Sequence, residues 1–267
     1  MKSNTLFARS ALGALLIAAP MAQAADLYVG GSVGYVDMDD IDTDGNFTSD
    51  FVTGQVTDVP GSPLTIPAGE SVNWDTELDS GYGIGLVFGM KFDLFSQSWR
   101  AELEYSYTTN DVDSHSNVTA AGIGLDPIDA GILLTGNTED LGVTTGDLVN
   151  NGQGEVETNS LFVNAYYDFK TSTNWTPFIG VGIGYSNVDV DYSPSNVGII
   201  DEDDDVFAWQ VMGGVSYAFN EQFELTGSVR YRETDEADLN SDLLPASFDI
   251  ETESLIVDLG IRYNFSF

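Results

Sequence analysis

The most informative feature of the chain is a regular alternation of apolar and polar residues. From Leu255 to Phe267 every second residue is apolar, and the residues between are mostly polar or small. Successive side chains of a β-strand point to opposite faces, so this pattern predicts a two-faced strand. The alternation recurs at residues 27–35, 82–92, 99–107, 161–169, 179–185, 207–219 and 223–231. The sequence therefore predicts eight strands.

A soluble β-sandwich also alternates, but three features favour a membrane barrel. Aromatic residues gather at the ends of the apolar faces, as they do at the two interfaces of a bilayer. Short connections (93–98, 170–174, 220–222) alternate with long ones (37–80, 109–157, 188–205, 233–253), as periplasmic turns alternate with external loops. The non-apolar faces also carry charges that a sandwich core would not tolerate unpaired.

We therefore expect an all-β protein, an eight-stranded antiparallel up-and-down transmembrane β-barrel with four long acidic external loops. Hairpins within residues 51–69 or 121–136 would either extend above the membrane or raise the strand count to ten.

The first 24 residues are expected to be a secretory signal peptide. Lys2 and Arg9 supply positive charge, residues 11–20 form a short apolar core, and Ala22–Gln23–Ala24 is an A-x-A cleavage site. Removal of residues 1–24 would leave a single barrel domain at 25–267. No later apolar run is long enough for a membrane helix, so we expect a multi-pass β-barrel in the outer membrane of a Gram-negative cell.

Charge narrows the range of partners. Without residues 1–24 the chain has six basic and 43 acidic residues, a net charge of −37. The four long loops hold 35 of the acids and no Lys or Arg. Nucleic acid and anionic surfaces require a basic face, so neither is an expected partner. The chain contains no cysteine and hence no disulfide.

Ten charged residues share the inward parity of their strands. An eight-stranded barrel has an interior just wide enough for side chains to fill, and buried charges need partners. We therefore expect a plugged lumen that is held by ion pairs and is neutral, with five bases against five acids. The residues are Lys91, Arg100, Glu102, Glu104, Asp168, Glu224, Arg230, Arg232, Asp258 and Arg262. A gated path for small ions along these charges is the alternative.

The stretch Asp40–x–Asp42–x–Asp44–Gly45 matches the front half of an EF-hand calcium loop. The twelfth position, which should be a bidentate Glu, is Phe51, and no helices flank the stretch. A true EF-hand is not expected. Two interpretations stay open: an irregular Ca²⁺ or Mg²⁺ site that uses these three carboxylates, and a solvated acidic loop. No other cofactor is expected.

Enzymatic activity is not expected. The single histidine, His115, lies between Ser114 and Ser116 in the second long loop. Neighbouring residues on an extended strand point apart, so these residues do not form a catalytic dyad by themselves. We expect His115 to be solvated.

The strands resemble those of the outer-membrane protein β-barrel family that includes the OmpA membrane domain and small surface-antigen porin-like proteins. The resemblance rests on WRAELEYSYTTND, NSLFVNAYYDFK, WTPFIGVGIGYS and FAWQVMGGVSYAF, and on the aromatic-ended IRYNFSF, which is similar to the signal that the barrel assembly machinery reads. Unlike full-length OmpA, the sequence shows no peptidoglycan-binding domain after the last strand. The resemblance implies outer-membrane lipid, lipopolysaccharide and the assembly machinery as partners, and we expect a monomer.

The sequence thus favours a structural, surface-exposed barrel that presents an acidic cap and serves envelope integrity or the binding of cations or a partner. A narrow porin-like channel for small solutes or ions and an adhesin or receptor for a cationic ligand are the alternatives.

Overall fold

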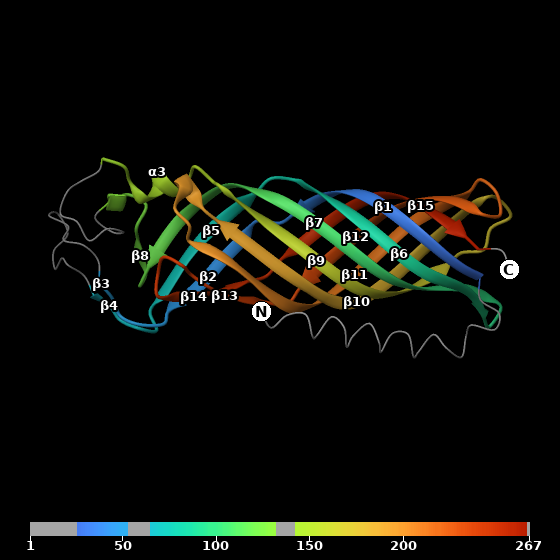
Figure 1. Ribbon diagram of the computed structural model, residues 1–267, viewed down its shortest axis with the longest axis horizontal. Coiled ribbons are helices and arrows are strands. Elements are labelled where there is room, and N and C mark those ends of the chain that lie inside the picture. Colours follow the sequence, from blue (N-terminus) through green and yellow to red (C-terminus); the bar gives the residue numbers. More distant parts are fainter. Residues whose placement is uncertain (1–25, 53–64, 132–141, 266–267) are drawn as a thin grey trace.

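The computed structural model describes residues 26–52, 65–131 and 142–265. The predicted signal peptide at 1–24 and the expected strand end at Phe267 lie outside these ranges. Within them the protein is built almost entirely of antiparallel β-strands, which form a long barrel (Figure 1).

Eight strands close the barrel, as predicted. Each pairs antiparallel with its neighbour in the ring, and the last pairs with the first. In ring order they are β1 (Asp26–Met38), β6 (Gly81–Leu94), β7 (Gln97–Ala120), β9 (Gly154–Asp168), β10 (Trp175–Tyr192), β11 (Ile200–Ala218), β12 (Phe223–Thr234) and β15 (Glu253–Asn264). The ten-stranded alternative is wrong, because the hairpin within 51–69, β3 (Phe51–Val52) with β4 (Thr65–Ile66), forms a separate two-stranded sheet.

One end of the ring carries short turns. Between β6 and β7, Phe95 and Ser96 have φ values of 53° and 64°. Two central residues with positive φ form the primed turn that matches the twist of a tight hairpin. The connections from β9 to β10 and from β11 to β12 are also short, and Figure 1 places these turns at the right-hand end.

The outer surface of the ring is apolar near the short turns. On β10, the side chains of Ile179, Val181 and Ile183 are more than half exposed. Aromatic pairs flank this band: Trp99–Tyr167, Trp175–Tyr217 and Phe223–Tyr263 on the side of the short turns, and Tyr185–Phe207 and Trp209–Tyr231 on the other. An apolar band between two aromatic girdles is the lipid-facing surface of a membrane barrel.

Beyond the second girdle the walls continue outside the membrane band as a lobe, which we call the external lobe and which Figure 1 shows at the left-hand end. Strands β7, β9, β10 and β11 run from the membrane band into it. The connections add β2 (Ile41–Phe47), β5 (Ser71–Leu78), β8 (Ile123–Gly124), β13 (Ala237–Asn240), β14 (Ala246–Ile250), the helix α3 (Thr145–Val149) and the short 3-10 helix η1 (Pro194–Asn196). Much of what the sequence suggested to be loop is therefore sheet.

The lobe forms because the strands exchange the polarity of their faces along their length. On β10, odd positions up to Tyr185 are apolar and face lipid, whereas Asp189 and Asp191 continue that face as carboxylates. Even positions change from Gly180 near the short turns to fully buried Val188 in the lobe. The lobe thus has an ordinary soluble core, to which Met38, Ile41, Phe47, Trp74, Val112, Val156, Val190, Tyr192, Ile200, Leu239, Phe248 and Ile250 belong.

Candidate functional site in the lumen and the external lobe

The ten charged residues predicted for the lumen lie inside the barrel and take part in ion pairs with one another. Eight of them are buried, and the Lys91 and Glu224 side chains are 22% and 14% exposed. They form three clusters along the barrel axis.

The cluster nearest the short turns is centred on Glu224 of β12. Its carboxylate pairs with Lys91 and, at 3.4 Å, with Arg262. Asn264 donates a hydrogen bond to the same carboxylate at 3.2 Å, and Ser216 accepts one from Arg262 at 3.0 Å. Two bases thus share one acid, and neutral polar groups complete the coordination.

The middle cluster is centred on Arg100 of β7, which is 2% exposed. Its guanidinium contacts Asp168 at 2.9 Å and Glu102 at 3.1 Å. The charged group also stacks over the rings of Tyr166 and Phe178, 4.3 Å and 4.7 Å from their centroids. Both carboxylates depend on this arginine, because neither has another ion-pair partner among the described residues.

The third cluster is centred on Glu104. Arg230 bridges Glu104 and Asp258, with 3.2 Å to the latter, and Arg232 approaches Glu104 at 3.9 Å. Asn164 and Gln210 both donate to Glu104, at 2.6 Å and 3.2 Å. Our sequence reasoning missed these two amides, although both lie at the same inward parity as the charges.

Above the third cluster, the lumen changes from charged to hydroxylic and then to apolar. The hydroxyls of Thr108 and Thr158 bond at 2.5 Å, and those of Ser160 and Ser186 bond at 2.7 Å. The valines of the lobe core follow. Two voids among the lumen residues measure about 20 and about 40 Å³, enough for a few waters.

Inward glycines make room for bulky partners. A Cβ on Gly180 would lie 2.3 Å from the Tyr166 ring, and one on Gly182 would lie 2.0 Å from the Asn164 amide oxygen. At these two positions the space serves neighbouring aromatic and amide side chains of β9.

The outer face of the lobe carries carboxylates in cross-strand rows. One row joins Asp111, Glu155, Asp191 and Asp201 across β7, β9, β10 and β11, and the next joins Glu157, Asp189 and Asp203. Adjacent strands lie about 4.8 Å apart, so acids stand next to acids over four strands. We call these seven residues the acidic rows.

Partial burial and mutual repulsion together raise the pKa values of two acids in the acidic rows. Partial burial, followed by the charges of Asp203 and Glu157, raises the pKa of Asp189. Partial burial together with Glu157 and Asp111 likewise raises the pKa of Glu155. Like charges directly opposite each other destabilise a sheet, and added cations would relieve that repulsion.

Asp40, Asp42 and Asp44 do not gather into one site. Asp42 and Asp44 lie on the exposed face of β2, opposite Asp75 and Asn73, and Asp40 precedes the strand and accepts from the Leu78 amide at 3.4 Å. The expected loop is therefore a strand. Within the described part of the chain, no three histidine or acidic side chains are close enough together to hold a metal ion.

The edge between β11 and β13 is held by carboxylates instead of a backbone ladder. Glu202 accepts from the Asn240 amide at 2.7 Å, and Asp204 accepts from the Asp238 amide at 3.2 Å. Glu202 and Asp204 therefore have a structural role, because they accept hydrogen bonds from backbone N–H groups at a strand edge.

The expectation of a solvated His115 is wrong. The ring is 2% exposed inside the lobe, and Nδ1 lies 2.9 Å from the Thr76 hydroxyl. Burial lowers the pKa of His115 to about 4. Ser114 instead points outward and donates to Glu77 at 3.2 Å, so the two neighbours are separated by the wall of the lobe.

No helix among the described residues is long and apolar enough to cross a membrane.

The fold has known relatives. The solved structure of the outer membrane protein OprG from Pseudomonas aeruginosa superimposes with a TM-score of 0.54 at 16% identity, over 91% of this chain and 97% of OprG.

The sequence has a curated relative as well. The outer membrane protein PagN of Salmonella typhimurium is 24% identical over 236 residues, which is 80% of this chain and 89% of PagN. Residues 9–265 match the model of the outer membrane protein beta-barrel domain. The protein thus belongs to the outer-membrane β-barrel family and resides in the outer membrane.

Proposed function

We propose that the protein is a structural, surface-exposed barrel with a closed lumen, whose lobe presents carboxylates to cations or to a cationic partner. The observation that carries the proposal is the set of three ion-pair clusters that fill the lumen. A water-filled pore would leave part of these side chains in solvent, whereas eight of the ten are buried.

Conductance in a planar bilayer tests the closed lumen. We expect the wild-type protein to give no reproducible current steps in low-salt buffer. The double variant Arg230→Ser/Arg232→Ser, which removes two large side chains from the third cluster, serves as the positive control and should conduct. Steps of uniform size from the wild-type protein would favour a narrow channel for small solutes or ions.

Binding of cations is the second part of the proposal, and the acidic rows favour it. Seven carboxylates on one face of four strands attract divalent ions, including those that bridge lipopolysaccharide phosphates. The same surface would also suit a receptor or an adhesin that binds a cationic ligand.

Isothermal calorimetry with Ca²⁺ and with a short polylysine tests this part. We expect the triple variant Glu157→Gln/Asp189→Asn/Asp203→Asn to bind both more weakly than wild type. Asp93→Asn, at the short-turn end, removes one carboxylate outside the lobe and should have no effect. No calcium or polylysine heat from the wild-type protein at millimolar concentration would rule out the acidic rows as a binding surface.

A further inference from the structure

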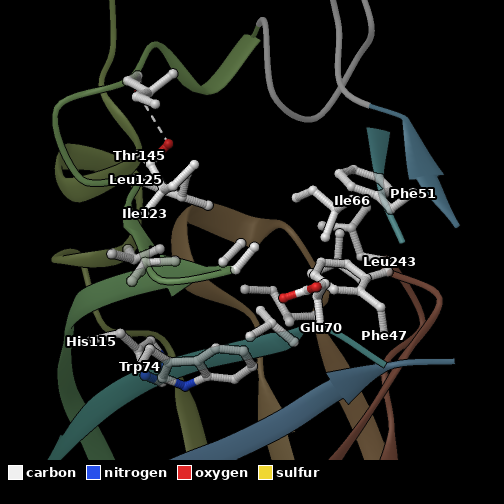
Figure 2. A pocket seen from close by; sticks show the side chains of 18 of the residues that line it. Phe47, Phe51, Ile66, Glu70, Trp74, His115, Ile123, Leu125, Thr145 and Leu243 are labelled. Atoms are coloured by element: carbon white, nitrogen blue, oxygen red, sulfur yellow. Dashed lines mark hydrogen bonds between the residues drawn. The ribbon is translucent and has the colours of Figure 1, made fainter. Parts of the chain in front are cut away.

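The external lobe contains a cavity that is lined by residues within the described ranges. The cavity has a volume of about 450 Å³ and lies among the lobe strands and α3. Figure 2 shows Trp74 and His115 at its floor, Phe47 and Leu243 on one side and Leu125 on the other. Small-molecule sites typically measure about 300–1,000 Å³, so the cavity has the size of a ligand site.

The lining is predominantly apolar. Aliphatic and aromatic side chains from strands far apart in the sequence meet here, and Phe47 stacks on Phe51 with ring centroids 5.6 Å apart. Protein interiors are normally packed as densely as organic crystals and leave few voids larger than a water molecule. An apolar space of this size has room for an apolar occupant.

Two buried polar atoms of the lining, His115 Nε2 and the Tyr192 hydroxyl, lack a hydrogen-bond partner among the described residues. His115 Nε2 is buried and makes no hydrogen bond with the described residues. The ring is held in place on its other side by Thr76, 2.9 Å from Nδ1, and by the edge-on ring of Tyr192, with centroids 4.8 Å apart. The imidazole is neutral at pH 7, because burial lowers the pKa of His115 to about 4. It offers one hydrogen bond to a molecule in the cavity.

Charge selects against anionic occupants. The exposed carboxylate of Glu70 belongs to the cavity lining, and the outer face of the lobe carries the acidic rows. A fatty-acid carboxylate would be repelled during approach and would meet no cationic side chain inside.

We propose that this cavity binds a neutral, lipophilic small molecule that carries a single hydrogen-bonding group, which pairs with His115 Nε2. Acyl chains with an ionised head group are excluded. The site is independent of the lumen and of the acidic rows, and it goes beyond the function proposed above.

Fluorescence with N-phenyl-1-naphthylamine, a neutral aromatic probe with one N–H, tests the proposal. The full protein is reconstituted in lipid nanodiscs, and empty nanodiscs give the partitioning background. We expect a saturable component with energy transfer from Trp74, which Trp74→Phe removes. Decanol should displace the probe at pH 7.4, and decanoate should not.

Two variants and one control locate the site. Ala120→Phe places a ring into the cavity and should weaken binding at least tenfold. His115→Phe retains the volume but removes the hydrogen bond, and should weaken binding about two- to tenfold. Val143→Phe changes an exposed lobe residue outside the lining and should bind as wild type does.

Any of three results would overturn the proposal. It fails if the wild-type protein shows no saturable component above empty nanodiscs, if Ala120→Phe binds like wild type, or if decanoate competes as well as decanol. If Ala120→Phe does not fold, judged by heat-modifiable gel migration, thermal unfolding of the wild type decides. Decanol must raise the unfolding midpoint and decanoate must not.

Discussion

At the scale of single residues, the lumen depends on two arginines, Arg100 and Arg230, that each pair with two acids. Arg100→Ala would leave Glu102 and Asp168 buried without a cation, and an uncompensated buried charge costs about 3–5 kcal/mol. We expect the free energy of unfolding in lipid vesicles, measured by urea titration, to fall by that amount.

The matched control is Lys170→Ala. Lys170 pairs with Asp93 at 2.9 Å, but both side chains are more than half exposed, and exposed pairs contribute about 0–1 kcal/mol. A similar loss in both variants would contradict the ion-paired lumen.

His115 gives the lobe an acid-sensitive group. In the unfolded chain an imidazole takes up its proton near pH 6.5, whereas in the folded lobe His115 stays neutral down to about pH 4. Unfolding therefore becomes more favourable as the pH falls from 6.5 to 4, by roughly 3 kcal/mol at the lower limit.

His115→Gln should lose this dependence. The measurement is the pH profile of lobe unfolding, followed by the emission of Trp74, whose ring lies 6.5 Å from that of His115. Parallel profiles for His115→Gln and wild type would refute a neutral buried imidazole.

The sequence could predict the lumen residues but not the burial of His115. The alternation along each strand located all ten charges, because every second residue faces inward as long as the strand contains no bulge. Leu78 of β5 pairs with Val112 of β7, whereas the preceding residue, Glu77, pairs with Ser114. Asp113 of β7 is therefore an extra residue without a partner in β5. This bulge reverses the parity beyond it and turns His115 inward, and no composition signal marks the position.

At the scale of elements, the acidic rows weaken the sheet they decorate. Asp189 and Glu155 have raised pKa values, so the folded lobe holds their protons at a higher pH than the unfolded chain does. The cost of partly burying these charges next to one another is fully present near pH 7 and is lost as the pH falls through their raised pKa values. We therefore expect mild acidification of a His115→Gln background to raise the unfolding midpoint of the lobe.

Asp189→Asn should reproduce this gain at neutral pH. In 20 mM salt we expect a stabilisation of a few tenths of a kcal/mol to about 1 kcal/mol, which shrinks in 1 M NaCl because the charges are screened. Asp93→Asn, outside the lobe, is the control. An Asp189→Asn variant that is less stable than wild type in low salt would argue that the row has a structural role.

The close approach of β9 and β10 at Gly182 should contribute to the stability of the barrel. Gly182→Ala would force a Cβ against Asn164 and should destabilise the barrel by about 1–3 kcal/mol. At Gly213 the nearest atom to an added Cβ is 3.8 Å away, so Gly213→Ala is the matched control. Equal urea midpoints for the two variants would show that the contact relaxes freely.

The sequence did not lead us to predict the external lobe. The stretch Val188–Asp189–Val190–Asp191–Tyr192 alternates as clearly as the membrane strands do, but its acids made it resemble a loop. The physical reason is that water has replaced lipid as the outer solvent. The inward positions must then be apolar, so the rule that apolar side chains of the membrane segment face outward no longer holds, although the parity of β10 is unchanged.

At the scale of the whole molecule, orientation can be tested with amines. Lys170 lies in a short turn and is 51% exposed, whereas Lys91 is 22% exposed within the lumen. If the short turns face the periplasm, a membrane-impermeant amine reagent should label Lys170 only after the outer membrane is permeabilised. Peptide mass mapping measures the labelling, with Lys170→Arg as the control, and labelling on intact cells would reverse the orientation.

The exchange of face polarity along β10 also fixes how deep the barrel sits in the bilayer. Moving the protein inward would carry the acidic rows toward the hydrocarbon, and moving it outward would carry the apolar band of β10 toward water. Both displacements are costly, so thickness mismatch must be absorbed by deformation of the surrounding lipid rather than by vertical sliding or tilt of the protein.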